Sequence, residues 1–308
     1  MAILGKFLEC TGRFSLLLPV YALADTVSLP SLTLGNTSFV DGISGPGLIY
    51  EQVLNHYSAN SLRDARGHEI PGSQKVRATA LVSHAALITE QRILGGYYGF
   101  EAMVPVVHTH LDFDGGPSGS KTRLGDIAVS PMMLQWDPVR LLGRPFWQRL
   151  NLTFTLPTGS YSKNASVNTG ANLWQANPHY AFTWELTDRL EFSGRLHYAW
   201  FSKNRRPADA LQASDIQPGA AWHGNYSFSY SITPEWRVGI AGYNLRQTHP
   251  DRIDGHRQND SKEKVWGIGP GIMYRKAKDI IYLNAYNEHG ATNASEGSRF
   301  NLRYIHLF

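Results

Sequence analysis

The sequence predicts an all-β protein, a transmembrane antiparallel up-and-down β-barrel of about 12 strands. Three observations predict it. Apolar and polar residues alternate over many segments of about ten residues, short and long connections alternate along the chain, and the tryptophans fall at the segment ends. Successive side chains of a strand point to opposite faces, so each segment has one apolar and one polar face. A membrane barrel turns the first toward lipid and the second toward a wet lumen.

The alternation is clearest in three segments. From Leu150 to Leu156, leucine and phenylalanine occupy one face while asparagine and threonine occupy the other, and the ranges 190–200 and 222–232 repeat this pattern. An even number of strands is typical of bacterial barrels. We expect the strands at 47–58, 75–88, 95–107, 126–136, 147–157, 174–185, 190–202, 220–232, 236–246, 264–275, 280–288 and 298–308.

The connections between these strands alternate in length. Tight links follow every second strand, whereas the intervening connections are long and rich in Gly, Asn, Asp and Ser, at 108–125, 158–173, 203–218 and 247–263. Outer-membrane barrels have short periplasmic turns and long extracellular loops, so we expect the long loops to face outward. The eight tryptophans lie at strand ends, four at each rim, as aromatic girdles at two membrane interfaces require.

The first 24 residues are predicted to be a signal peptide. Lys6 and Arg13 precede a short apolar run at 14–22, and Ala22-Leu23-Ala24 fits a small-x-small cleavage site. Residues 25–46 are then expected to form a periplasmic or lumenal segment, and residues 47–308 the barrel. The protein would accordingly be exported to the outer membrane of a Gram-negative bacterium.

Composition excludes several classes of function. Cys10 is the only cysteine and lies in the predicted signal peptide, so the mature chain would have no disulfide and no thiolate nucleophile. The formal charge of +4 arises from 29 basic and 25 acidic residues without a basic run, so no nucleic-acid partner is expected. We expect no cofactor and no metal.

The chain ends on a strand whose last residue is Phe308, with Tyr304 at an alternate position behind it. A terminal aromatic residue with apolar residues at alternate positions resembles the signal that the outer-membrane assembly machinery reads. His306 interrupts the apolar alternation. We therefore assign Tyr304 and Phe308 to an assembly signal, and we expect the assembly machinery, outer-membrane lipid and lipopolysaccharide as partners.

Alternation assigns a set of charged side chains and histidines to the lumen. One hypothesis is a charged constriction that sets selectivity, and the favoured one is a lattice of ion pairs that fills a narrow barrel. Closure of the barrel would place the last strand beside the first, so that Arg299 and Arg303 could meet Glu51. The lumen candidates are Glu51, Arg77, Glu101, Arg149, Glu191, Arg195, His197, His223, Arg299 and Arg303.

Four prolines lie inside predicted strands, namely Pro105, Pro131, Pro178 and Pro270. Proline lacks the N–H that a β-ladder requires, so bulges are the first explanation. Pro105 and Pro131 fall on neighbouring strands, where two missing donors could open a lateral path from lumen to lipid. We therefore take these two as candidates for a lateral exit.

Catalytic and metal sites are only weakly indicated. His56 and Ser58 lie two apart on one strand face, an arrangement in which a histidine could activate a serine, but no acidic residue is evident to orient the histidine. His and Asp residues at 110–114 and 249–256 lack the fixed spacing of a metal site and are expected to be solvated loops.

Several motifs resemble a known family. They are Pro46-Gly47-Leu48-Ile49-Tyr50-Glu51 followed by Tyr57-Ser58-Ala59 and Arg63-Asp64, Leu124-Gly125-Asp126-Ile127-Ala128-Val129-Ser130-Pro131, and Pro157-Thr158-Gly159-Ser160-Tyr161 with Asn172-Leu173-Trp174. In order and spacing the chain resembles the meta-pathway phenol-degradation family of outer-membrane β-barrel proteins. The resemblance implies a channel for aromatic or other hydrophobic small molecules. His56 stands where the family is expected to have an aromatic residue.

The expected function is therefore passive uptake of small hydrophobic or aromatic molecules through an outer-membrane channel, without enzyme activity. Two alternatives stay open. One is a lipid-modifying barrel enzyme that uses Ser58, and the other is a structural barrel with a plugged lumen.

Overall fold

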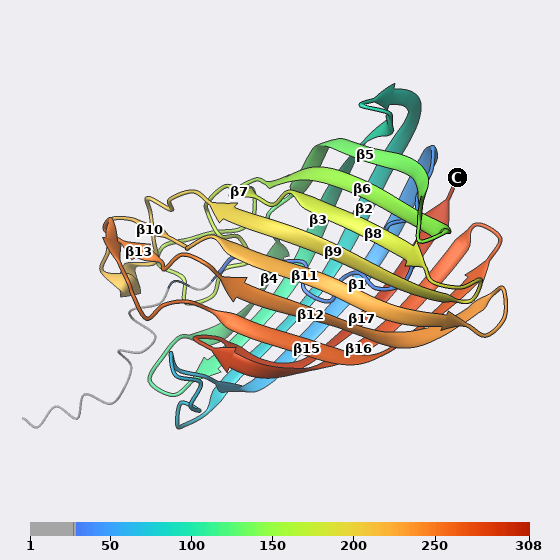
Figure 1. The fold of residues 1–308 in the computed structure, drawn as a ribbon. Coiled ribbons are helices and arrows are strands. Elements are labelled where there is room, and N and C mark those ends of the chain that lie inside the picture. The colour runs from blue at the N-terminus through green and yellow to red at the C-terminus, as the bar shows by residue number, and fades with distance from the viewer. Residues whose placement is uncertain (1–26, 28) are drawn as a thin grey trace, which may run out of the picture.

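Twelve antiparallel strands close into a barrel in the computed structural model, which describes residue 27 and residues 29–308 (Figure 1). The last strand pairs with the first, from Ile49 opposite Leu307 to Leu62 opposite Ser295, so the wall has no free edge. The predicted fold class is thereby confirmed, whereas the predicted signal peptide lies outside the described residues. The wall consists of β1 (Gly47–Leu62), β2 (Gln74–Ile93), β3 (Gly96–Phe113), β5 (Ala128–Leu141), β6 (Arg144–Thr155), β8 (His179–Glu185), β9 (Leu190–Phe201), β11 (Ala221–Ser231), β12 (Trp236–Gln247), β15 (Lys264–Lys276), β16 (Asp279–Thr292) and β17 (Ser295–Leu307).

Shorter elements decorate the long-loop rim. They are β4 (Ser118–Leu124), β7 (Gln175–Ala176), β10 (Ile216–Gln217), β13 (Arg252–Ile253), β14 (His256–Arg257) and the 3-10 turn η1 (Asp209–Leu211). β4 continues the pairing of β3 beyond the wall, which is why β3 extends past its predicted end at 107. β10, β13 and β14 form a separate small sheet. In the described residues, no helix is long and apolar enough to cross a membrane.

Two tight turns fix the hairpins at the opposite rim. Leu94-Gly95 joins β2 to β3 and Leu142-Gly143 joins β5 to β6, and all four residues have positive φ values. Two-residue hairpin turns of type I′ require positive φ at both central positions, which glycine adopts without steric cost. The indole nitrogens of Trp136 and Trp184 donate hydrogen bonds to the carbonyls of Leu94 and Leu141, so these tryptophans lie at this short-turn rim.

The large apolar residues are exposed and the polar residues are buried, which is the reverse of the distribution in a soluble protein. Leu196, Phe228 and Ile240 project from the outer face and are each more than half exposed. Asn151 and Asn301, on the inner face, are 1% exposed or less. Since soluble proteins bury their large apolar residues, this arrangement is typical of a wall whose outer face meets lipid.

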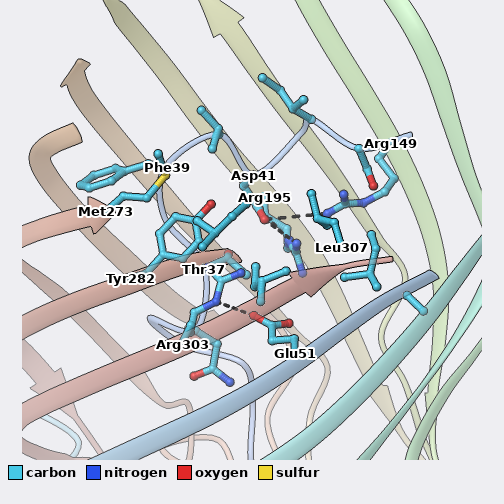
Figure 2. Close-up of a pocket in the computed structure, with 18 of the residues that line it drawn as sticks. Thr37, Phe39, Asp41, Glu51, Arg149, Arg195, Met273, Tyr282, Arg303 and Leu307 are labelled. Atoms are coloured by element: carbon cyan, nitrogen blue, oxygen red, sulfur yellow. Dashed lines mark hydrogen bonds and ion pairs between the residues drawn. The ribbon is translucent and has the colours of Figure 1, made fainter. Parts of the chain in front are cut away.

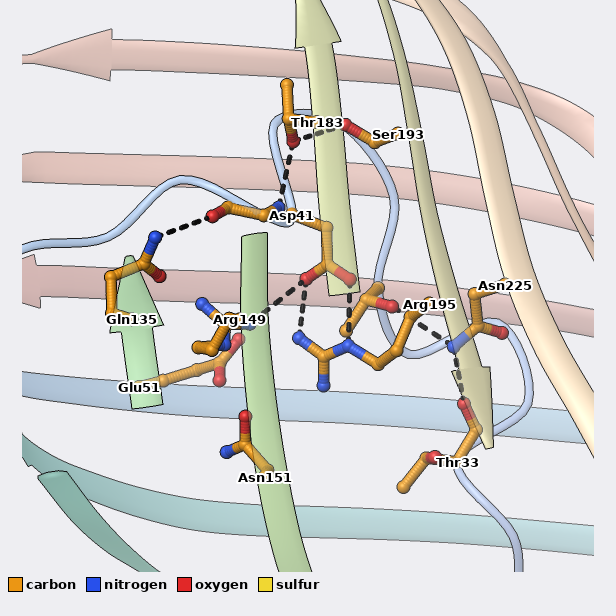
Figure 3. A network of polar contacts seen from close by, with 12 residues as sticks. Thr33, Asp41, Glu51, Gln135, Arg149, Asn151, Thr183, Ser193, Arg195 and Asn225 are labelled. Atoms are coloured by element: carbon orange, nitrogen blue, oxygen red, sulfur yellow. Dashed lines mark hydrogen bonds and ion pairs between the residues drawn. The ribbon is translucent and has the colours of Figure 1, made fainter. Parts of the chain in front are cut away.

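The chain that precedes β1 runs through the lumen along its full length. At the long-loop rim, the backbone N–H of Leu29 donates to Glu263 (2.9 Å). Further in, Gly35 N–H donates to Asn225 (2.8 Å), and Gly42 N–H donates to Thr183 (2.8 Å) before β1 begins at the short-turn rim. Figure 3 shows this coil crossing between the strands. Residues 29–46 therefore occlude most of the barrel interior, and we call them the lumen segment.

Apolar side chains of the lumen segment pack into the largest buried apolar cluster of the described residues. Phe39 is 1% exposed and packs with Tyr243, Met273 and Tyr282 of the wall, while Leu34 joins the same cluster. Alternation could not assign these contacts, because the segment has no regular secondary structure.

Candidate functional site: the lumen

A cavity of about 680 Å³ lies between the lumen segment and the wall (Figure 2). Its volume falls within the range of small-molecule sites, roughly 300–1,000 Å³. Phe39 and Asp41 of the segment line one side, and the cavity reaches the short-turn rim at Asp188 and Pro234. The lumen segment closes the cavity toward the long-loop rim. Seven of the ten lumen candidates line it, namely Glu51, Glu101, Arg149, Glu191, Arg195, His197 and Arg303.

A chain of ion pairs crosses four adjacent strands of the wall. Arg303 of β17 contacts Glu51 of β1 (Nε–Oε1 2.6 Å), and His84 of β2 contacts the other oxygen of Glu51 (Nδ1–Oε2 2.7 Å). The second ring nitrogen of His84 lies 3.0 Å from Glu101 of β3. Both ring nitrogens of His84 face carboxylates. His84 can donate an N–H bond to each of them only in its imidazolium form. The contact between Arg303 and Glu51 matches the expectation across the seam.

Hydrogen bonds continue this chain toward β5 and β6. The free oxygen of Glu101 accepts bonds from Ser130 Oγ (2.8 Å) and Asn151 Nδ2 (2.9 Å). Six neighbouring strands are thus linked at one level of the barrel. This geometry is the lattice that the sequence favoured over an open charged ring, while a role in selectivity stays a prediction.

Asp41 of the lumen segment lies between two arginines of the wall (Figure 3). Its carboxylate accepts two bonds from Arg195 (Nε–Oδ2 2.8 Å, Nη2–Oδ1 2.5 Å), whereas Arg149 Nη2 is 3.8 Å away. The single carboxylate of Asp41 therefore faces the guanidinium groups of both Arg195 and Arg149. The bidentate geometry with Arg195 is the strong form of this interaction.

Arg299 does not reach Glu51, unlike the expectation at the seam. The register places Arg299 opposite Tyr57, and its guanidinium donates to Asn55 (3.0 Å) and lies 3.9 Å from Glu288. Tyr57 and Tyr243 each donate to Glu288, at 2.7 and 2.8 Å. Arg299 thus belongs to a second cluster nearer the long-loop rim.

Arg77 is the one lumen candidate that faces away from the lumen. It pairs with Ser58 of β1 and His110 of β3, which lie on the outer face, and its own side chain is exposed. Near the rim the outer face meets headgroups and water, so polar side chains are tolerated there. Apolar and polar alternation then no longer indicates which face is turned toward the lumen. The assignment of Arg77 to the lumen was wrong.

The remaining candidates point inward. Glu191 of β9 is 1% exposed and accepts hydrogen bonds from Ser193 (2.5 Å) and Ser229. His197 of β9 and His223 of β11 stack with ring centroids 4.1 Å apart. His179 of β8, which the sequence analysis did not select, lies beside His197 with ring centroids 4.6 Å apart and ring planes tilted by 35°.

The His- and Asp-containing loops and the pair of His56 and Ser58 lie within the described residues. Across residues 29–308, no group of three or more His, Cys, Asp or Glu side chains is arranged to hold a metal ion. His56 Nδ1 lies 2.8 Å from Thr79 Oγ1 on the neighbouring strand, so this bond leads away from Ser58.

Several participants were missed by the sequence analysis. Asp41 precedes the first strand, where no alternation exists. His179 lies on the polar face of its predicted strand, so the alternation that selected His197 contained its signal. His84 lies on the face opposite to Arg77, so the mistaken assignment of Arg77 to the lumen excluded it.

A second cavity of about 520 Å³ lies on the outer face at the junction of β3 and β5. β5 carries one extra residue relative to both of its neighbours at Ser130 and Pro131, so Pro131 lies in a bulge. This outer cavity shares three lining residues, Leu48, Ala86 and Glu101, with the lumen cavity. The wall is therefore thin at the bulge. Pro105 lies further toward the long-loop rim and does not line the outer cavity.

Comparisons with known proteins agree with this architecture. A crystal structure of the COG4313 outer membrane channel from Pseudomonas putida F1 is similar, with a TM-score of 0.76, 16% identity, and coverage of 88% of this chain and 98% of that chain. The translocator domain of the autotransporter NalP from Neisseria meningitidis is less similar, with a TM-score of 0.49, 10% identity, and coverage of 86% and 90%. No curated protein matches in sequence. Residues 59–304 match the family described as "Putative MetA-pathway of phenol degradation". This outer-membrane β-barrel therefore belongs to that family, as its motifs indicated.

Proposed function

We propose that the protein is a passive outer-membrane channel for small hydrophobic or aromatic molecules. The observation that carries the proposal is the occluded lumen with a cavity of about 680 Å³ whose wall is shared with an apolar cavity on the lipid side. A porin for hydrophilic solutes keeps a water-filled lumen. Here the lumen segment fills that path, and the remaining space is of small-molecule size.

The bulge at Pro131 is the proposed lateral exit. Pro131 supplies no ladder donor, and Tyr98 reaches across to its carbonyl (2.7 Å) on the outer face. An apolar solute that leaves the lumen here enters lipid and avoids water, which favours the route by roughly 25 cal/mol per Å² of apolar surface.

The family and the matched structure support the same function. The family description refers to phenol degradation, and the similar structure is titled an outer membrane channel. We further propose export by the signal peptide at 1–24 and assembly through Tyr304 and Phe308. Phe308 is 63% exposed at the short-turn rim, and its N–H donates to Leu48 (2.9 Å), so its ring is accessible.

A structural barrel with a plugged lumen remains the second candidate, because the segment that occludes the lumen is tightly hydrogen bonded. Flux measurement separates the two. Purified protein in liposomes containing lipopolysaccharide should accelerate entry of labelled phenol while conducting ions only weakly. Absence of phenol flux at full protein incorporation would favour the plug.

The lateral exit has its own test. Pro131→Val restores a backbone donor at the bulge, so we expect slower phenol flux with nearly unchanged ion conductance. Pro105→Val is the matched control, because Pro105 lies away from the outer cavity. Equal effects of the two variants, or a parallel loss of conductance, would contradict an exit at the bulge.

A further inference from the structure

A patch of nitrogen donors lies on the inner wall where β6, β8 and β9 pair. Ala181 of β8 lies opposite Arg149 of β6 and opposite Arg195 of β9. His179, two residues before Ala181 on the same face, lies directly opposite His197. Two arginines and two histidines thus surround an alanine that adds only a methyl group to the wall. We call these four residues the basic patch.

The histidines of the basic patch are buried without hydrogen-bond partners. His179 is 5% exposed and His197 is 2% exposed, and neither ring nitrogen of either residue is bonded within the described part of the chain. Both residues line the lumen cavity. Buried polar atoms are nearly always bonded, and leaving one unpaired costs about 1–3 kcal/mol. These nitrogens therefore indicate a partner that lies in the cavity.

The charge of the basic patch indicates the sign of that partner. Arg149 Nε has no hydrogen-bond partner, and its nearest carboxylate, Asp41, is 3.8 Å away and already forms the bidentate pair with Arg195. Glu101, the other carboxylate on this side of the cavity, is bound to His84. One guanidinium charge is thus left without a carboxylate of its own, and a buried charge of this kind favours an anion.

Part of the remaining cavity wall is suited to an apolar ring. Met103, Met133 and Met273 line it, and methionine sulfur makes favourable contacts with aromatic edges while its flexible chain adapts to shape. The stacked imidazoles of His197 and His223 add flat faces beside the donors. A ligand that satisfies both parts has one anionic head group and an aromatic body.

We propose that the basic patch binds an aromatic monocarboxylate, with the carboxylate between Arg149 and the nitrogens of His179 and His197 and the ring against the methionines. The inference rests on the proposed function, because it names a solute class for the same cavity. It extends the solute range from neutral aromatics to aromatic acids.

Titration calorimetry of the full chain in detergent tests this site with benzoate as the probe. We expect benzoate to bind and the isosteric neutral benzamide to bind at least tenfold more weakly. Arg149→Gln should weaken benzoate about tenfold or more, because it removes a charge-assisted contact, and Arg149→Lys should restore part of the loss. Arg77→Gln, on the outer face, should leave benzoate affinity unchanged.

Three results would overturn the site: equal affinity for benzoate and benzamide, an effect of Arg77→Gln as large as that of Arg149→Gln, or unchanged affinity in Arg149→Gln. Should Arg149→Gln fail to fold, His179→Phe keeps an aromatic ring without its nitrogens and must also weaken benzoate binding. Phenol flux in liposomes is measured on the same protein. If phenol crosses but benzoate does not bind, the inference fails and the proposed function stands. If benzoate binds but phenol does not cross, the site stands and the proposed function fails.

Discussion

Replacement of Asp41 by asparagine should loosen the lumen segment. The Asp41 carboxylate is 5% exposed and is the only acidic group of the lumen segment, where it neutralises Arg195 directly and Arg149 at longer range. Removal of one member of a buried ion pair typically costs about 3–5 kcal/mol, because the remaining charge stays buried without a partner. Nearby anchors, such as the bond from Gly42 N–H to Thr183, are neutral and weaker.

A cost of this size changes the ratio of displaced to docked segment by a factor on the order of 10²–10⁴. Single-channel recording in planar bilayers measures that ratio as time spent in a high-conductance state. Asp41→Asn should increase this time strongly, whereas Asp41→Glu, which keeps the charge, should have a smaller effect. The double variant Asp41→Asn with Arg195→Gln should recover part of the docking, since it also removes the uncompensated charge. If Asp41→Asn conducts like the unchanged protein, the ion pair does not hold the segment.

Three further predictions concern the rest of the molecule. Phe154→Lys places a charge on the lipid face and should lower the free energy of unfolding in urea by about 2–4 kcal/mol, whereas Phe154→Leu should have little effect. Deletion of Phe308 should reduce surface-exposed protein and increase unfolded chain in the periplasm, and normal insertion would show that the terminal residue is no assembly signal. Burial, and to a lesser extent the charge of Asp251, raises the pKa of Glu263 from 4.5 to about 8. When the segment is released, Glu263 ionises from pH 4.5 upward, so docking of Leu29 at Glu263 should weaken as the pH rises to about 8. Ion conductance should therefore increase between pH 4.5 and about pH 8. The variant Glu263→Gln cannot ionise and should abolish this pH dependence.

Alternation predicted the wall well because lipid contact imposes it on every strand. The faces of the segment from Leu150 to Leu156 follow from the rule that outward side chains meet hydrocarbon, and inward residues such as Asn151 are free to be polar. The rule fails where lipid contact ends. Arg77 lies near the rim, and the small apolar residues beside it, Ala78 and Ala80, fit a lumen as readily as a lipid face.

Contacts that depend on register or on irregular chain could not be predicted. Alternation placed Arg299 and Arg303 on the inner face, but only the pairing of β17 with β1 decides that Arg303 reaches Glu51 and Arg299 does not. The bond from Arg195 to Asp41 joins residues 154 positions apart, and Asp41 belongs to a segment without periodicity. Long-range contacts of this kind leave no local signal in the sequence.

The lumen segment and the polar wall together explain how a barrel with a hydrophilic interior suits a hydrophobic solute. Glu51 and Glu101 pair with His84 and Arg303, so these charges demand few water molecules and leave little field across the cavity. With the segment in place, the space that remains is lined by methionines together with charged side chains, and it adjoins the thin wall at Pro131. A hydrated solute would lose its water there without replacement, at a cost of several kcal/mol for each unpaired polar group, whereas an apolar solute loses none. Under the proposed function, the lumen selects against solutes that need solvation by water. The charge of Arg149, which has no carboxylate of its own, can compensate an anionic group.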